Sequence, residues 1–303
     1  MKEGGKQMNP IKIGEVDKVT ITTLVDDNSG FNSQFLGHHG LSLLIEITSG
    51  DIRKKILLDT GQSEKAILFN SRHLNIDLNT IDMIILSHCH YDHTGGLIGI
   101  LKEIGREIPV IAHPAIFRQT YSVDPYLRSI GMPLENTKEN IRQHGGHLLL
   151  TDKPLNIMKG VISTGEVERS TDFENKGINT FNIKENRISH DDLIDDLSII
   201  INIRNKGILV ISGCSHAGII NILKHTVKIT GIKDVYGVVG GLHLLNSSDL
   251  IIDKTIESLS NMNIQLVAAG HCTGLNGQYK LSKAFDMGYQ MLHSGKKLEI
   301  TSK

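Results

Sequence analysis

The segment His88-Cys89-His90-Tyr91-Asp92-His93 places three imidazoles and one carboxylate directly after a short apolar run and directly before a helical pattern. Alternate residues of an extended segment point to the same side, so His88 and His90 can reach one metal ion. Asp92 and His93 fall on the turn into the helix and can reach a second ion nearby. Burying this cluster without a cation would leave several polar groups unpaired. The pattern therefore predicts a fold that builds a metal site around this segment.

Three further segments share one arrangement, in which an apolar strand is followed by glycine and then by histidine. They contain His216, His243 and His271. Strand ends in a layered α/β fold gather at one edge, where sites are usually built, and glycine lets the backbone approach closely or turn sharply. We expect His216 and His271 to be metal ligands. His243 is expected either to touch substrate or to pack.

Several other side chains near these segments have two interpretations. Cys214 can ligate a soft metal as thiolate, or it can be a small buried residue at a strand end. Asp59 is either a turn residue or an acceptor that orients a ligand histidine. The acidic run 191–196 is either a solvated turn or the source of a bridging carboxylate. Cys89 and Cys272 are expected to pack.

Imidazole and carboxylate ligands suit zinc, with iron and manganese as alternatives. One or two such divalent ions, with an open coordination position, would activate water near neutral pH.

The formal net charge of -1 leaves no net basic field for nucleic acid, so the expected partner is a small-molecule substrate. The three cysteines have no short spacing, and the N-terminus is polar. With no run of ~18 apolar residues, a cytoplasmic protein without a membrane partner is expected.

Short apolar or β-branched runs predict strands, and apolar residues at helical spacing predict helices. Residues 114–186 have poor periodicity, which indicates an irregular insertion. The β-rich start, a hairpin around 205–207 and the alternating helices favour one α/β domain over 1–303, an αββα sandwich. The predicted strands are 19–25, 41–47, 55–59, 82–87, 108–112, 197–203, 208–212, 235–239 and 264–269, and the predicted helices are 63–70, 97–104, 217–229 and 252–259.

The H-x-H-x-D-H segment after a strand resembles a motif of the metallo-β-lactamase superfamily. Upstream, LLDTG (57–61) is similar to the first block of that superfamily. More narrowly, the chain resembles the metal-dependent hydrolases related to the archaeal dihydropterin–ribofuranosylaminobenzene 5′-phosphate synthase. The segments that carry this resemblance span nearly the whole chain: HHGLSLLIE (38–46), LSHCHYDHTGGL (86–97), STGEVER (163–169), DDLSIII (195–201), GCSHAGIIN (213–221), GGLHL (240–244) and GHCTG (270–274).

The resemblance implies an αββα fold with the metal site at one edge between the two sheets. It implies His88 and His90 at the first metal, and Asp92 and His93 with His271 at the second.

This chain departs from the β-lactamase-like pattern at two places. The usual third ligand lies in a GHTxGS block, and a bridging aspartate follows a later strand. Here DDLS (195–198) and GCSH (213–216) stand near those places. The third and bridging ligands are therefore open among His216, Cys214 and an aspartate of 191–196.

Three functions are compatible with this site. The first is a hydrolase that uses metal-activated water on a phosphoester, ester or lactone, with Asp92 orienting the water as well as ligating. The second, implied by the resemblance, is a metal-dependent transferase that condenses a pterin diphosphate with ribofuranosylaminobenzene phosphate. The third is a non-catalytic or redox metal-binding protein. The sequence does not predict the oligomeric state.

Overall fold

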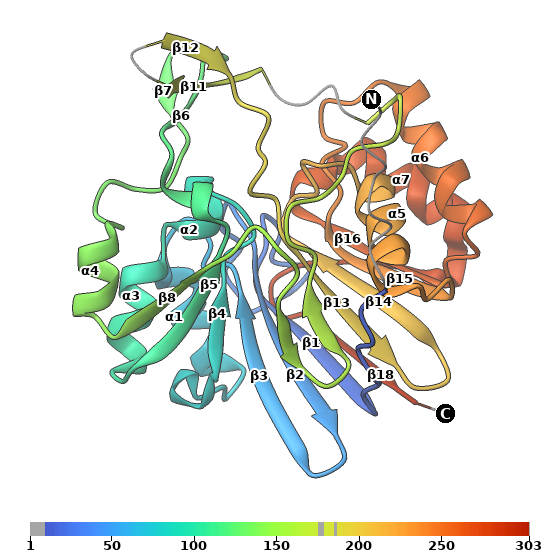
Figure 1. Ribbon diagram of the computed structural model, residues 1–303, viewed down its shortest axis with the longest axis horizontal. Coiled ribbons are helices and arrows are strands. Elements are labelled where there is room, and N and C mark those ends of the chain that lie inside the picture. Colours follow the sequence, from blue (N-terminus) through green and yellow to red (C-terminus); the bar gives the residue numbers. More distant parts are fainter. Residues whose placement is uncertain (1–9, 175–178, 185–186, 303) are drawn as a thin grey trace, which may run out of the picture.

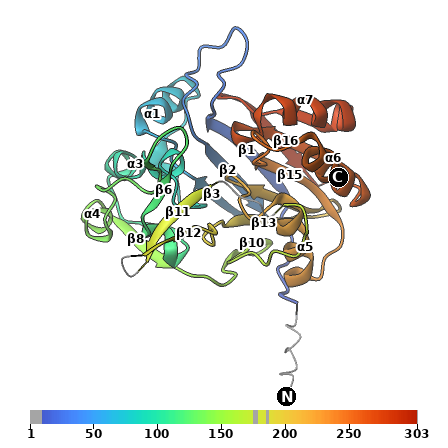
Figure 2. The same ribbon diagram turned by 90° about the horizontal axis from the view of Figure 1, so that it is seen from above.

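Two sheets packed face to face form the centre of the protein, and helices cover their outer faces (Figure 1). The computed structural model describes residues 10–174, 179–184 and 187–302. Figure 2 shows the layers from above, with α1, α3 and α4 on one side and α5, α6 and α7 on the other. This is the predicted αββα sandwich, in which each sheet buries both of its faces.

The first sheet is built from the N-terminal half of the chain and the last strand. Strands β1, β2 and β3 are antiparallel, and β4, β5 and β8 continue the sheet in parallel. In spatial order the strands are β18 (Lys297–Thr301), β1 (Lys18–Val25), β2 (Ser42–Ser49), β3 (Ile52–Leu58), β4 (Met83–Ile85), β5 (Ile108–Ala112) and β8 (Gly146–Leu150).

The second sheet is built mainly from the C-terminal half. Strands β13 and β14 form the predicted antiparallel hairpin, and β14 to β17 run parallel. In spatial order the strands are β17 (Tyr289–Met291), β16 (Leu266–Gly270), β15 (Val235–Gly241), β14 (Gly207–Ser212), β13 (Ser198–Ile203), β10 (Val161–Ser163) and β9 (Asn156–Met158).

The predicted helices are present, and their ends follow local sequence rules. Ser63 accepts a hydrogen bond from the backbone N–H of Lys65 at the start of α1, and Gly105 ends α3 at a φ of 62°. None of the helices in the described ranges is both long and apolar enough to cross a bilayer. The helices are α1 (Glu64–His73), α2 (Tyr91–Thr94), α3 (Leu97–Ile104), α4 (Lys138–Gln143), α5 (Ile219–Thr230), α6 (Asp249–Asn261) and α7 (Gly274–Phe285).

Alternate residues of one strand pack into different layers of the core. In β13, Ile199 and Ile201 lie between the two sheets, whereas Ile200 packs with the apolar residues of α5 and α6. All three side chains are fully buried. Burial of both faces explains why such strands are continuous apolar runs rather than alternating ones.

Residues 114–186, expected as an irregular insertion, supply strands to all three sheets of the structure. They contribute β8 to the first sheet and β9 and β10 to the second. Most strands here have two or three residues, too short to leave a periodic pattern. Residues 175–178 and 185–186 lie outside the described part. The third sheet, at the top of Figure 1, consists of β12 (Arg187–His190), β11 (Thr180–Lys184), β6 (Thr120–Ser122) and β7 (Arg128–Ser129).

Candidate metal centre

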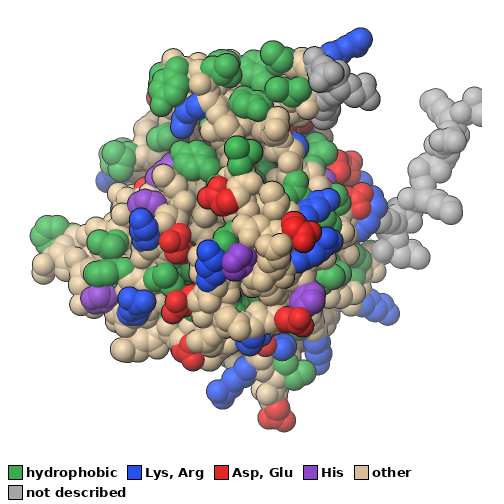
Figure 3. All heavy atoms as spheres, turned by 90° about the vertical axis from the view of Figure 1, so that its left-hand side faces the viewer, with side chains coloured by type: hydrophobic (Ala, Val, Ile, Leu, Met, Phe, Trp, Pro, Cys, Tyr) green, Lys and Arg blue, Asp and Glu red, His purple; other side chains and the backbone are tan. Residues whose placement is uncertain are grey.

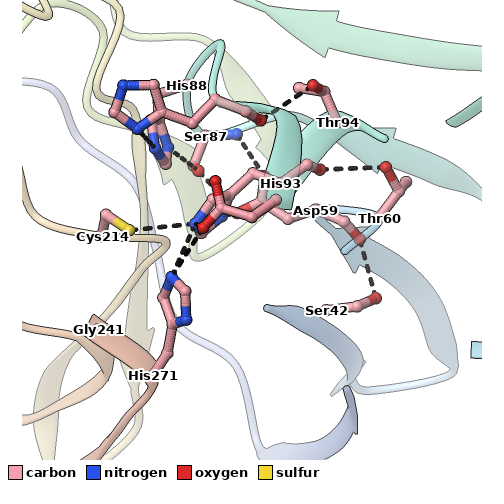
Figure 4. Close-up of polar contacts among 12 residues, drawn as sticks. Ser42, Asp59, Thr60, Ser87, His88, His93, Thr94, Cys214, Gly241 and His271 are labelled. Carbon is pink, nitrogen blue, oxygen red and sulfur yellow. Dashed lines mark hydrogen bonds and ion pairs between the residues drawn. The ribbon is translucent and has the colours of Figure 1, made fainter. Parts of the chain in front are cut away.

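The expected ligands converge at one edge of the sandwich, where several strands end (Figure 4). His88 lies shortly after β4, His243 after β15 and His271 after β16. Because β14, β15 and β16 are parallel neighbours, their carboxyl ends meet at this edge and bring His216 to it as well. The histidines that follow apolar strands therefore meet, as the sequence predicts.

His88, His90 and His216 form the first group of potential ligands. The Nε2 atom of His88 lies 3.1 Å from Nδ1 of His90 and 3.1 Å from Nε2 of His216. All three side chains are buried. Within the described residues, Nε2 of His90 and Nδ1 of His216 have no hydrogen-bond partner. Three converging imidazoles of this kind fit a divalent cation.

Asp92, His93 and His271 form the second group. The Nε2 atoms of His93 and His271 lie 3.1 Å apart, and Oδ2 of Asp92 lies 3.6 Å from the first and 3.3 Å from the second. Because both rings donate through Nδ1 to carboxylates, their neutral forms direct two Nε2 lone pairs at each other. A cation held by both imidazoles and the carboxylate removes this conflict.

Cys214 connects the two groups. Its Sγ lies 3.1 Å from Nε2 of His93, and it forms a third set of potential ligands with His88 and His93. Burial raises the pKa of the Cys214 thiol well above its ordinary value, so a thiolate here requires a neighbouring cation. Gly213 allows the backbone before Cys214 to lie close to Ser87, since a Cβ at this position would lie 2.1 Å from Oγ of Ser87.

Two carboxylates fix the orientation of the second group's imidazoles. Nδ1–H of His93 donates to Oδ2 of Asp59 at 2.7 Å, and Nδ1–H of His271 donates to Oδ2 of Asp27 at 2.8 Å. Asp59 also accepts from the backbone and hydroxyl of Ser87. With Nδ1 occupied in this way, Nε2 of each ring is left to face the cluster, an arrangement typical of metal-ligating histidines.

Four residues around the cluster have left-handed backbone conformations that are unfavourable for side-chain-bearing residues. They are Asp59, Ser215, His243 and His271, with φ between 48° and 62°. Such conformations persist only where the surrounding structure holds them, and they concentrate at functional sites.

The electrostatics favour neutral imidazoles in the first group and an ionised carboxylate in the second, where, despite burial, Asp27 and Asp92 raise the pKa of His271 well above its ordinary value. Burial holds the pKa of His88 and of His216 well below the ordinary value. Burial alone would raise the pKa of Asp92, but the neighbouring His93 and His271 hold it well below its ordinary value. Neutral imidazole and ionised carboxylate are the protonation states that bind metal.

Acid is expected to destabilise the metal-free protein through His90. Burial lowers the pKa of His90 from 6.5 to about 4, so below pH 6.5 the unfolded chain binds a proton that the folded chain does not. The stability of the folded protein is therefore unaffected by His90 above pH 6.5 and decreases as pH falls from 6.5 toward 4. Urea unfolding of chelator-treated protein should show about 2 kcal/mol lost to His90 at pH 5. His90→Asn should make this dependence less steep, although His88 and His216 still contribute to it, and an unchanged slope would contradict the assignment.

No carboxylate of the acidic run 191–196 belongs to a group of potential ligands among the described residues. The run is not a solvated turn either, since Asp191, Asp195 and Asp196 are buried. Arg118 donates to both carboxylate oxygens of Asp191 and forms an ion pair with Asp195 at 2.7 Å. Asp196 accepts from the backbone N–H of Ala217 at 2.7 Å. These carboxylates hold loops in place, and their partner Arg118 is too remote in sequence to be anticipated.

The remaining cysteines are buried, as expected. Cys89 packs in the core beneath the outer helices of the first sheet. Cys272 lies closer to the site than a packing role requires, since its Sγ is 3.5 Å from the carbonyl oxygen of Cys214. His243 lines a cavity together with its neighbour His216, whose ring centroid is 4.3 Å away.

Sequence reasoning missed Asp27 and His39 as functional candidates. Oδ1 of Asp27 lies 2.7 Å from Nδ1 of His39, and Nε2 of His39 lies 3.5 Å from Oδ2 of Asp92. Asp27 thus holds both His271 and His39. The position of Asp27 just after β1 could have indicated a role at the site, because other site residues also lie just after strands.

Comparison with known proteins agrees with this geometry. Residues 37–160 match the family model of the metallo-beta-lactamase superfamily. The chain is 41% identical over 289 residues to the 7,8-dihydropterin-6-methyl-4-(beta-D-ribofuranosyl)-aminobenzene-5'-phosphate synthase of Methanocaldococcus jannaschii, covering 94% of this chain and 98% of the synthase.

Two further proteins are similar to this chain. The crystal structure of Tm1679, described as a metal-dependent hydrolase of the beta-lactamase superfamily, is 28% identical with a TM-score of 0.77, covering 94% of this chain and all of the other. A ribonuclease Z of Clostridium novyi is 32% identical over 120 residues, 34% of this chain and 38% of its own length. The absence of a nucleic-acid partner therefore stays a prediction. The near full-length similarity to the synthase shows that this chain is an enzyme that belongs to the metallo-β-lactamase superfamily.

Proposed function

We propose that this enzyme joins a reduced pterin, activated as a diphosphate on its 6-methyl carbon, to the amine of ribofuranosylaminobenzene phosphate. The observation that carries the proposal is the 41% identity, over 94% of the chain, to a synthase named for this condensed product. In the reaction the C–O bond to diphosphate breaks, a C–N bond to the aromatic amine forms, and the amine loses one proton.

The site suits two divalent metal ions, and we infer zinc. His88, His90 and His216 would hold one ion, and Asp92, His93 and His271 the other, with Cys214 between them. This donor set of imidazoles, one carboxylate and one thiolate matches zinc chemistry. The convergence of Nδ1 of His90 and Nε2 of His216 on Nε2 of His88, at 3.1 Å each, supports this assignment.

When bound, the two cations would neutralise the charge that develops on a diphosphate leaving group. The chain's own residues keep that arrangement rigid. Asp59 and Asp27 fix the rings of His93 and His271 through their Nδ1 atoms. We assign His243 to accept the proton from the amine, because it lines the neighbouring cavity and belongs to neither of the two groups that would hold the ions. Its own potential co-ligands are Cys214 and Cys272.

Hydrolysis is the second candidate, favoured by the resemblance to the structure described as a metal-dependent hydrolase. In that case water attacks the electrophile, and Asp92 of the second ligand group orients that water. The same residues serve both reactions, so the outcome depends on whether the aromatic amine or water attacks the electrophile.

One assay separates the two reactions. Zinc-loaded protein is incubated with 6-hydroxymethyl-7,8-dihydropterin diphosphate, with and without ribofuranosylaminobenzene phosphate, and diphosphate release is measured. We expect release only with the amine, together with the condensed product. Release without the amine, or cleavage of a bis-aryl phosphodiester, would identify a hydrolase instead. His90→Ala should abolish either activity, and equal rates in this variant would refute the proposed site.

A further inference from the structure

A cavity of ≈ 530 Å³ adjoins the candidate metal centre. Its wall comes mainly from five parts of the chain: the β6–β7 hairpin, Phe173 with Glu174, the loop after β14, the loop after β15, and α6. His216 and His243 lie in this wall, so the cavity reaches the first group of potential ligands. Its volume is in the range of small-molecule sites.

The wall of this cavity combines three chemical characters. Imidazoles of the metal centre form one part. Phe173, Leu242, Leu244 and Ile251 form an apolar part. The hairpin contributes Arg128, the one lysine or arginine among the lining residues. A molecule that fits this wall has a reactive group, a flat or apolar body and an anionic group.

Arg128 is available to bind an anion. It forms no ion pair with any residue in the described ranges of the chain, and it lies on the short strand β7, held opposite Ser122 of β6. A guanidinium in this position presents several donors that match the oxygens of a phosphate.

The other anion-binding position at this cavity is already filled. Glu174 accepts from the backbone N–H groups of Ile220 and Asn221, at 2.8 and 2.9 Å, at the start of α5. Its carboxylate therefore satisfies the N-terminus of that helix. Among the side chains that line the cavity, Arg128 is then the cationic group left for a phosphate that lies away from the metal centre.

We propose that Arg128 binds the phosphate of an aromatic amine substrate, whose ring lies along the apolar wall and whose amine faces the metal centre. This inference rests on the proposed function and adds to it the residue that selects the phosphorylated acceptor. Asp124 of the same hairpin also lines the cavity, and its carboxylate opposes the same phosphate. Substitution of Arg128 should therefore weaken binding of the phosphate, and substitution of Asp124 should strengthen it.

The test compares ribofuranosylaminobenzene 5′-phosphate with its dephosphorylated form as acceptor, in the zinc-loaded enzyme. Arg128→Ala should raise KM for the phosphorylated acceptor roughly 10- to 100-fold, the range for a hydrogen bond to a charged group. Its kcat, and its KM for the dephosphorylated acceptor, should stay unchanged. Arg128→Lys should recover part of the loss, and Asp124→Asn should lower KM for the phosphorylated acceptor.

Arg187→Ala is the matched control, because Arg187 lies in the same small sheet but outside the cavity wall. Equal KM changes for both acceptors, or none in Arg128→Ala, would overturn the inference. Calorimetric binding of the two acceptors, without the pterin, keeps the test independent of turnover. If no condensation occurs but Arg128→Ala still removes the preference for the phosphorylated form, the inference stands and the proposed function fails. Absence of any preference in the wild-type protein also overturns the inference.

Discussion

The His93→Ala variant is expected to lose more than ~100-fold of the activity and to bind less metal, while keeping its fold. The loss should exceed the ~10- to 100-fold typical of residues that only orient a ligand. His93 belongs to two sets of potential ligands, since its Nε2 faces Cys214 at 3.1 Å and His271 at 3.1 Å. Removing it therefore weakens both ion positions at once.

The fold should survive this change because the cluster is supported from outside. Asp59, the partner of His93, keeps two hydrogen bonds from Ser87, and the core layers do not depend on the cluster. Metal content, circular dichroism and turnover measure metal binding, fold and activity separately. Asp92→Asn should behave in the same way, and His147→Ala, at an exposed ring on β8 outside the ligand groups, should change none of them. Global unfolding of His93→Ala would mean that the metal is structural.

Arg118→Ala is expected to reduce the free energy of unfolding by about 3–5 kcal/mol, as when one partner of a buried ion pair is removed. The Arg118 side chain is 13% exposed, and its guanidinium contacts the buried carboxylates of Asp191 and Asp195. Without it, both carboxylates stay buried with their charge uncompensated. Asp195 also accepts from the backbone N–H of Cys89 at 2.8 Å. Activity should therefore fall as well, since Cys89 lies between two of the candidate ligands.

Urea unfolding monitored by circular dichroism measures this change. Arg204→Ala is the matched control, because Arg204 forms ion pairs with Glu15 and Asp17 but is 48% exposed. An exposed pair contributes only ~0–1 kcal/mol. If Arg118→Ala does not accumulate as folded protein, Asp191→Asn is a milder change that should still destabilise more than Arg204→Ala. Equal effects of the two arginine substitutions would contradict the role of the buried network.

The predictable part of the fold is the part with long periodic patterns. Strand β5 has the predicted bounds, and the apolar face of α3 and its terminal Gly105 locate that helix. Helix α7 has two glycines and few apolar residues, so its pattern is weak, and β17 has only three residues. These elements are specified by packing against neighbours that are distant in sequence.

The same distinction applies to the site. A local cluster such as His88 to His93 is recognisable because its spacing alone places the ligands together. His216 and His271 could be anticipated because a strand and glycine precede each of them. Arg118 could not, and Asp27 had only its position after a strand as a signal, since their partners, such as His271 for Asp27, lie far away in the chain. Which residues join which group depends on strand order, which the local pattern does not contain.

The most direct measurement is anomalous scattering from crystals of the zinc-loaded protein. We expect two zinc peaks, one contacted by the imidazoles of residues 88, 90 and 216, the other by residues 92, 93 and 271, with the sulfur of Cys214 beside both. Crystals that show no ion among these side chains under zinc-saturating conditions, with the imidazoles of His88, His90 and His93 turned apart, would contradict it.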